Sequence, residues 1–200
     1  MKLLCGLTSP FVRKVRIVAA LSGLADRIEL VPADPMNPDD QLRVRNPLGK
    51  VPALALDDGT TIYDSSVICQ YLIGLSGNAA LLPAEPAARA RVLTLEALGD
   101  GLLDALILQR YEVIFREPAM RSQRWTDHQA GKTARALAAL EAAPPAGPPD
   151  LGQIAVACAL GYLDFRFEGA WRAGHPRLVA WLDAFAARTP AWAAAAPPPA

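Results

Sequence analysis

Three short stretches in the first third of the chain place polar groups beside prolines and predicted helix starts. They are SPFV (residues 9–12), NPLGKVPAL (46–54) and YDSSV (63–67). Ser9 followed by Pro10 is typical of a helix N-terminus, which attracts anions, including a thiolate. The Val51–Pro52 step, where a strand begins, is a candidate cis peptide bond.

The third stretch offers groups for both ends of a zwitterion. Asp64 can accept hydrogen bonds from an ammonium group, while Ser65 and the first amides of a helix can hold a carboxylate. Together, the three stretches would bind a small thiol peptide: its amino-acid head at Asp64, its backbone along Val51 and its sulfur at Ser9. A purely structural interpretation stays open, because Ser and Asp are both preferred helix N-caps.

The elements that position these residues alternate between strand and helix. Apolar alternation predicts strands over 2–7, 27–34, 51–56 and 60–64, and helical spacing predicts helices over 10–22 and 65–75. This βαβ–loop–ββα order predicts a compact α/β unit. From Pro86 onward the periodicity is helical only, with helices over 85–115 (loosened at Gly99 and Gly101), 124–143, 151–165 and 175–189 and a frayed tail over 193–200. We expect two domains in contact, 1–76 and 86–200, joined by a linker over 77–85.

Composition excludes several classes of function. The 20 basic and 20 acidic side chains cancel, so nothing favours nucleic acid or an anionic membrane surface. Three scattered cysteines and two histidines fit neither a disulfide framework nor a metal site. No apolar run approaches the ~20 residues of a membrane span, and Pro10 with Arg13 and Lys14 argues against a signal peptide. We expect a reduced, cytoplasmic protein.

The chain resembles bacterial cytosolic glutathione S-transferases over essentially its whole length. The stretches that carry this resemblance are SPFVRKVRI, NPLGKVPAL, DSSVICQYL, DLGQIAVACALGYLDFRF and HPRLVAWLDAFAART. The resemblance implies a thioredoxin-like N-terminal domain followed by an all-helical domain. It also implies glutathione as a co-substrate on the first domain, an electrophile site between the two, a homodimer and a role in detoxification.

The resemblance also assigns roles to individual residues. Ser9 would hydrogen-bond the glutathione sulfur and act as the catalytic residue. The glutathione site would comprise Ser9, Phe11, Lys50, Val51, Pro52, Asp64 and Ser65. Tyr111 and Phe115, four residues apart on one helix face, either line the pocket for the electrophile or belong to the core.

Several other side chains have structural interpretations. Arg13, Lys14 and Arg16 would form a solvated helix face or a dimer edge. Cys5 would be buried packing. Tyr162, Asp164 and Arg166 would form a buried network.

Three functions stay open from the sequence. The first is conjugation of glutathione to a small apolar electrophile, or a related glutathione-dependent step. The second is disulfide reduction of the glutaredoxin kind, which needs a cysteine where this chain has Ser9 or Val12. The third is a non-catalytic module of the same fold that binds apolar ligands or a protein partner.

Overall fold

The N-terminal half is built on a small mixed sheet. The computed structural model describes residues 1–199, and its four strands are β1 (Lys2–Cys5), β2 (Glu29–Pro32), β3 (Ala53–Ala55) and β4 (Thr61–Ile62). Their order in the sheet is β2-β1-β3-β4, with β1 parallel to β2 and antiparallel to β3, and β3 antiparallel to β4. All four predicted strands are present, each shorter than predicted.

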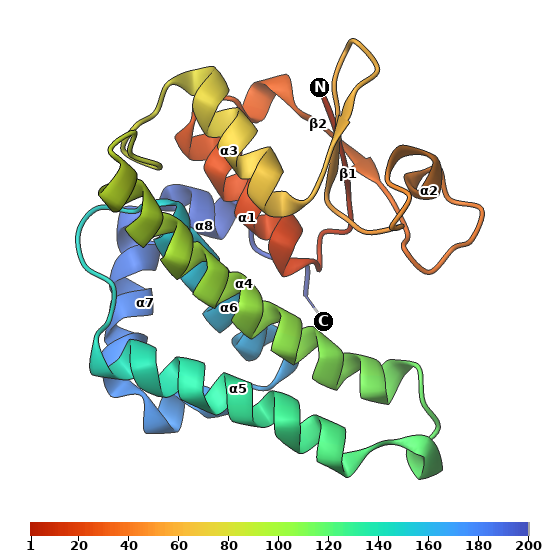
Figure 1. Ribbon diagram of the computed structural model, residues 1–200, viewed down its shortest axis with the longest axis vertical. Helices are drawn as coiled ribbons and strands as arrows, with labels where there is room; N and C mark the ends of the chain where they lie inside the picture. The colour runs from red at the N-terminus through yellow and green to blue at the C-terminus, as the bar shows by residue number, and fades with distance from the viewer. Residues whose placement is uncertain (200) are drawn as a thin grey trace.

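Both faces of this sheet are covered, because side chains alternate along each strand. Leu3 and Leu54 point to the face that carries α1 (Pro10–Leu21) and α3 (Ser65–Ser76). Leu4 and its neighbours on β3 point to the opposite face, where Leu42 of α2 (Leu42–Arg45) packs. Figure 1 shows α1 and α3 side by side and α2 beyond the sheet. The sequence did not predict α2, because a helix of four residues is too short to show a period.

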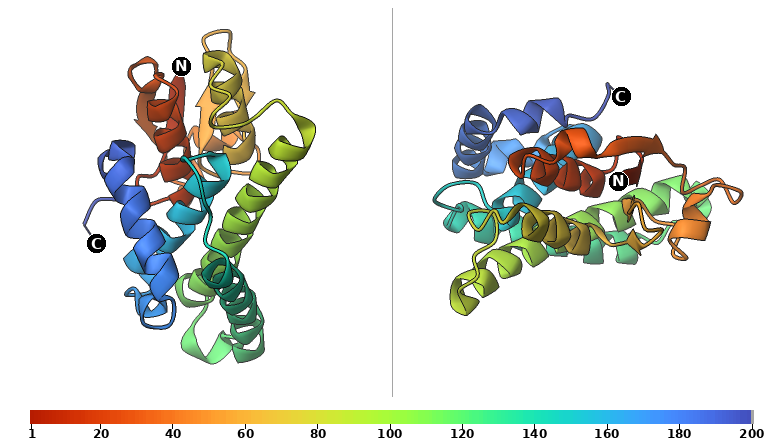
Figure 2. Two further views of the ribbon diagram at one scale, coloured as in Figure 1. Left: turned by 90° about the vertical axis from the view of Figure 1, so that its left-hand side faces the viewer. Right: turned by 90° about the horizontal axis from the view of Figure 1, so that it is seen from above.

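The C-terminal half is helical, as predicted. It consists of α4 (Pro86–Ile114), α5 (Gln123–Ala142), α6 (Leu151–Arg166), α7 (Pro176–Arg188) and α8 (Pro190–Ala194), with 3-10 turns at 25–27, 118–120 and 170–174 along the chain. Residues 151–161 of α6 are all buried, and α6 packs against both α4 and α1. Figures 1 and 2 show α6 between these two helices. The predicted fold class, a thioredoxin-like domain followed by an all-helical one, is confirmed. No helix among residues 1–199 is long and apolar enough to cross a membrane.

The long helix α4 is continuous, so the predicted loosening at its two glycines is wrong. A Cβ atom on Gly99 would lie 2.7 Å from the carbonyl carbon of Ala155 on α6. Gly99 therefore lets the two helix backbones approach closely. A Cβ atom on Gly101 would meet nothing within 4 Å.

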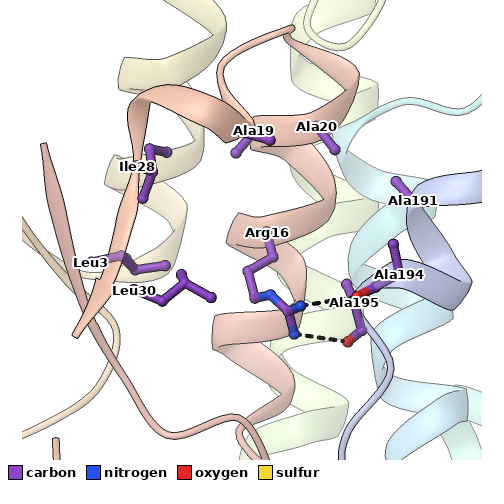
Figure 3. Close-up of a pocket in the computed structure, with 10 residues that line it drawn as sticks. Leu3, Arg16, Ala19, Ala20, Ile28, Leu30, Ala191, Ala194 and Ala195 are labelled. Atoms are coloured by element: carbon purple, nitrogen blue, oxygen red, sulfur yellow. Dashed lines mark hydrogen bonds between the residues drawn. The ribbon is translucent and has the colours of Figure 1, made fainter. Parts of the chain in front are cut away.

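The C-terminal segment is better ordered than predicted. After α8, the side chain of Ala195 is buried. The Arg16 guanidinium donates hydrogen bonds to the carbonyl oxygens of Ala194 at 2.9 Å and Ala195 at 3.3 Å, beside a mostly apolar cavity of about 210 Å³ (Figure 3). The frayed tail is therefore wrong for residues 193–195, and Ala200 lies outside the described residues.

Candidate functional site

The sheet topology brings the three polar stretches to one edge. Strand β3 begins beside the end of β1, because Leu4 pairs with Ala53 in an antiparallel ladder. Strand β4 ends at the same edge, because Ile62 pairs with Leu54. The turn after β1, the turn before β3 and the turn after β4 therefore meet, and these turns contain Ser9, Val51 and Asp64.

Ser9 is positioned by the turn that leads from β1 into α1. Its backbone N–H donates to the carbonyl oxygen of Gly6 at 2.9 Å, and its Oγ accepts from the N–H of Val12 at 3.3 Å as the N-cap of α1. Within residues 1–199 no acceptor takes the hydroxyl proton of Ser9. The hydroxyl can therefore donate to an anion placed at the start of α1, where the helix dipole also favours negative charge.

The Val51–Pro52 peptide bond is cis, as the sequence suggested. No backbone hydrogen bond among residues 1–199 engages the N–H or the carbonyl oxygen of Val51. The preceding loop is held by Asn46, whose Nδ2 donates to the carbonyl oxygen of Lys50 at 2.8 Å and whose Oδ1 accepts from the N–H of Leu48 at 3.0 Å. The loop thus presents an unpaired backbone at Val51 and the exposed side chain of Lys50.

Asp64 and Ser65 begin α3. Asp64 is the N-cap, with Oδ1 accepting from the N–H of Ser66 at 3.1 Å, and its side chain is exposed. Ser65 is only 4% exposed. The cap interpretation of Asp64 is therefore correct, and its exposed carboxylate can still accept from an ammonium group.

Helix α4 adds an acidic residue that the sequence analysis missed. Partial burial raises the pKa of Asp104, while the nearby charge of Lys50 lowers it and that of Asp64 raises it further. No local pattern could have indicated it, because the approach of α4 to the α/β unit is a tertiary contact.

A small hollow of about 10 Å³ beside Ser9 lies between α6 and the turn that leads from β1 into α1. Its lining includes Gly161, Tyr162 and Phe165 of α6, together with Ser9 and with Pro197 of the C-terminal segment. The sequence analysis had assigned Tyr162 to a network with Asp164 and Arg166. Instead, Asp164 accepts hydrogen bonds from Nε1 of Trp171 at 2.8 Å and from the guanidinium of Arg172 at 2.9 and 2.6 Å. Both donors lie in the 3-10 turn that follows α6.

The two aromatic residues predicted for the electrophile pocket lie near the end of α4. Tyr111 is 48% exposed and Phe115 is 55% exposed, with ring centroids 5.0 Å apart in an edge-to-face arrangement. Neither belongs to the core, so the core interpretation is wrong and the pocket assignment stays a prediction. Phe11 is half-buried and packs against the main core.

The three cations after Ser9 do not form a solvated face. Lys14 is fully buried, and its Nζ contacts Oε1 of Glu96 at 2.9 Å and Oδ2 of Asp100 at 2.6 Å. The guanidinium of Arg13 lies 3.3 Å from the centroid of the Trp192 ring and donates to the carbonyl oxygen of that residue at 3.0 Å. These cations tie α1 to α4 and α8, because partners distant in sequence meet them in the fold.

The cysteines take no part in this site as nucleophiles. Cys5, Cys69 and Cys158 are buried and free. Burial is the largest influence on each thiol and raises its pKa, to about 12 for Cys158. A thiol with a raised pKa carries little thiolate at neutral pH. Among residues 1–199, no three His, Cys, Asp or Glu side chains gather to hold a metal ion.

Comparison with known proteins identifies the family. Residues 8–73 match the family described as glutathione S-transferase, N-terminal domain, and residues 123–184 match glutathione S-transferase, C-terminal domain. An Escherichia coli K12 protein described as uncharacterized GST-like protein YibF is 36% identical over 189 residues, covering 92% of each chain.

Solved structures agree with this assignment. A glutathione transferase family member from Pseudomonas fluorescens Pf-5, solved with bound glutathione, has a TM-score of 0.92 at 44% identity and covers 98% of both chains. A second structure from that organism, with bound S-(propanoic acid)-glutathione, has a TM-score of 0.89 at 42% identity, over 99% of this chain and all of the other. The fold, the site geometry and these matches agree, and the chain belongs to the glutathione S-transferase family.

Proposed function

We propose that the protein is a glutathione transferase that activates the glutathione thiol for attack on a small electrophile. The observation that carries this proposal is the geometry of Ser9. Its oxygen already accepts a hydrogen bond from Val12, so its proton is free for a sulfur atom at the start of α1. The bound glutathione in a relative that is 44% identical supports the choice of ligand.

In this proposal, the peptide lies along the edge of the sheet. The γ-glutamyl ammonium group meets the carboxylate of Asp64, and the γ-glutamyl carboxylate meets the first amides of α3 and Ser65. The backbone of Val51, next to Pro52, pairs with the cysteinyl residue. Lys50 lies beside the glycine carboxylate, and the half-buried Phe11 helps to shape the sulfur end of the site.

The chemical step is activation of the thiol. A cysteine-like thiol has a pKa near 8.5, so little of it is thiolate at neutral pH. One hydrogen bond from Ser9 and the dipole of α1 each contribute about 1 kcal/mol. Together they raise the thiolate fraction roughly tenfold. The thiolate then attacks an electrophile that lies beside Ser9, between the α/β unit and the helical half.

Calorimetric titration tests the ligand, and a Ser9→Ala variant tests the mechanism. We expect saturable binding of glutathione at submillimolar concentration, with tighter binding than S-methyl-glutathione. In Ser9→Ala, we expect conjugation to slow about fivefold while glutathione binding is largely kept, because one hydrogen bond of about 1 kcal/mol is lost. The ultraviolet absorbance of the bound thiolate should titrate at a higher pH in the variant.

A matched variant separates this effect from helix capping. Ser122 is the N-cap of α5, and its Oγ accepts from the N–H of Trp125 at 3.2 Å, as Ser9 does for Val12. We expect Ser122→Ala to lose a similar stability, about 1 kcal/mol, and to keep full turnover. Unchanged turnover in Ser9→Ala would remove Ser9 from the mechanism.

The alternative is a non-catalytic binding module for apolar ligands. The feature that favours it is the cavity of Figure 3, lined by Leu3, Ile28, Leu30 and alanines of α1 and α8. This cavity shares no residue with the Ser9 corner. Clear conjugation of any electrophile would reject the alternative.

We further propose a cytoplasmic homodimer. Free cysteines suit a reducing compartment. Val67 and Leu75 of α3 expose half or nearly half of their apolar surface, which a second copy would cover. Sedimentation of the purified chain measures its oligomeric state, and a monomer at micromolar concentration would exclude the dimer.

A further inference from the structure

The cavity of Figure 3 lies between β2, α1 and the C-terminal segment. Leu30 of β2 pairs with Leu3 in the parallel ladder, so both side chains point to the face of the sheet that carries α1. Six alanines of α1, the 25–27 turn and residues 191–195 line most of the remainder. Because alanine side chains are short, these surfaces do not fill the space between them, and about 210 Å³ stays open.

This cavity is open to solvent and separate from the proposed glutathione site. Ala20, Leu30 and Ala194 of its lining are exposed. The cavity shares no lining residue with the hollow beside Ser9. A cavity of about 150 Å³ inside a protein binds a molecule as large as benzene. The volume here therefore accommodates an apolar chain or ring of about six carbons.

Arg16 is the charged residue of this lining, and its guanidinium keeps free donors. Two of its nitrogens donate to the carbonyl oxygens of Ala194 at 2.9 Å and Ala195 at 3.3 Å. A guanidinium has five N–H groups, so three remain for another acceptor. Figure 3 shows the half-buried Arg16 side chain between Leu30 and Ala194. The two carbonyl oxygens thus orient the guanidinium beside the cavity without cancelling its charge.

No carboxylate of the chain neutralises this guanidinium. Within residues 1–199, Arg16 forms no ion pair. Glu29 is adjacent to Leu30 on β2, but side chains alternate along a strand, so Glu29 points to the opposite face of the sheet. There it pairs with Lys2 at 3.5 Å. A guanidinium with free donors and apolar walls around it favours a carboxylate as its partner.

We propose that this cavity binds a small amphipathic carboxylate. The apolar part of the ligand, about six carbons long, fills the space between the alanines, Leu3 and Leu30, and its carboxylate accepts hydrogen bonds from Arg16. A neutral ligand of the same shape is bound more weakly, because it offers the guanidinium no negative charge. This second site goes beyond the proposed transferase function and does not depend on it.

Three probes separate the contributions of charge and apolar surface. Hexanoate has both, hexanamide has the chain without the charge, and acetate has the charge without the chain. In nuclear magnetic resonance titrations of the labelled protein, we expect hexanoate to bind at least about fivefold more tightly than either of the others. Hexanoate should shift the amide signals of Ala191 and Ala194. Equal binding of hexanoate and hexanamide, or no saturable binding of hexanoate, would overturn the proposal.

Substitutions at Arg16 test the recognition of the carboxylate. Arg16→Gln should bind hexanoate and hexanamide about equally, whereas Arg16→Lys, which keeps the charge, should retain most of the preference. Arg27→Gln is the control, because Arg27 is exposed in the adjacent 25–27 turn and does not line the cavity. A preference for hexanoate that survives in Arg16→Gln would overturn the proposal.

A pair of filling substitutions tests the location. Ala191 lines the cavity, whereas Ala193 is exposed on the same helix and does not line it. We expect Ala191→Phe to weaken hexanoate binding about tenfold, because the ring occupies the space of the chain, and Ala193→Phe to leave it unchanged. Hexanoate binding that Ala191→Phe leaves intact would place the ligand elsewhere and overturn the proposal.

A glutathione derivative distinguishes this site from the proposed transferase site. Saturating S-benzylglutathione, which would occupy the Ser9 corner and the electrophile site, should leave hexanoate binding unchanged. Competition between the two ligands would overturn the second site while supporting the first. If neither glutathione nor S-benzylglutathione binds but hexanoate does, the proposed function fails and the carboxylate site stands.

Discussion

Asp64 combines two roles that one substitution can separate. Its carboxylate caps α3 through the N–H of Ser66, and in the proposed site it also faces the ammonium group of glutathione. Asparagine is an equally good N-cap but carries no charge. Replacing Asp64 with asparagine therefore separates its role as a helix cap from its proposed role in binding the ammonium group.

We expect Asp64→Asn to weaken glutathione binding about tenfold with little loss of stability, because a charge-assisted hydrogen bond becomes a neutral one. Calorimetry measures the affinity, and urea unfolding measures the stability. Asp150→Asn is the control: Asp150 caps α6 by accepting from the N–H of Gln153 at 2.8 Å, so this variant should bind glutathione normally. If Asp64→Asn also binds as the wild type does, Asp64 does not contact the ammonium group.

At the scale of elements, the contact between α4 and α6 sets the shape of the helical half. This contact depends on Gly99, where a Cβ atom would lie within 2.7 to 2.9 Å of Ala155 and Val156. Real Cβ atoms do not approach other atoms this closely, so a larger residue forces the helices apart. The same helix offers Gly101, an exposed glycine with free space around it.

We expect opposite effects of the same substitution at these two glycines. Gly99→Ala should destabilise the protein by roughly 1–3 kcal/mol through overpacking. Gly101→Ala should stabilise it by up to about 1 kcal/mol, because alanine is the better helix former. Thermal or urea unfolding measures both. A stabilisation shared equally by the two variants would show that helix propensity, rather than packing, controls position 99.

Elements and helix caps were predictable from the sequence because their signals are local. The alternation over 27–34 and the helical spacing from Pro86 indicated the strands and helices, and the N-cap roles of Ser9 and Asp64 followed from residue type. The functions of Gly99 and Lys14 were not predictable, because each depends on a partner dozens of residues away. Single-element periodicity carries no information on which faces meet.

At the scale of the whole molecule, a buried charge cluster joins the two halves. Lys14 of α1 lies between Glu96 and Asp100 of α4. Burial by itself lowers the pKa of Lys14, but the surrounding negative charges raise it overall. Burial is also the largest influence on Asp100 and raises its pKa to about 6, although Lys14 opposes the rise. The cluster therefore makes the union of the two halves depend on pH.

The sign of this dependence follows from linkage. Asp100 has a higher pKa in the folded chain than the usual 3.8, so the folded state holds the proton more tightly. Its contribution to stability is largest below about pH 4 and falls as the pH rises through about 6. Between those values, the wild type should lose roughly 2 kcal/mol relative to Asp100→Asn, which cannot titrate. Urea unfolding of both proteins across this range measures the difference. Parallel pH profiles would show that Asp100 does not titrate there.

The hydrogen bonds between α1 and the segment after α7 have a consequence for synthesis. Arg13 and the carbonyl oxygen of Trp192 are 179 residues apart in sequence, as are Arg16 and that of Ala195. Helix α1, which Ser9 caps, is among the first elements that the ribosome makes. The carbonyl oxygens that accept hydrogen bonds from Arg13 and Arg16 belong to residues 192 to 195, which are made last. Until then these two cations can be held only by water or by other proteins. In a nascent chain stalled before Trp192, α1 should therefore be incompletely docked. We expect a protease to cleave α1 faster in this stalled chain than in the full-length protein.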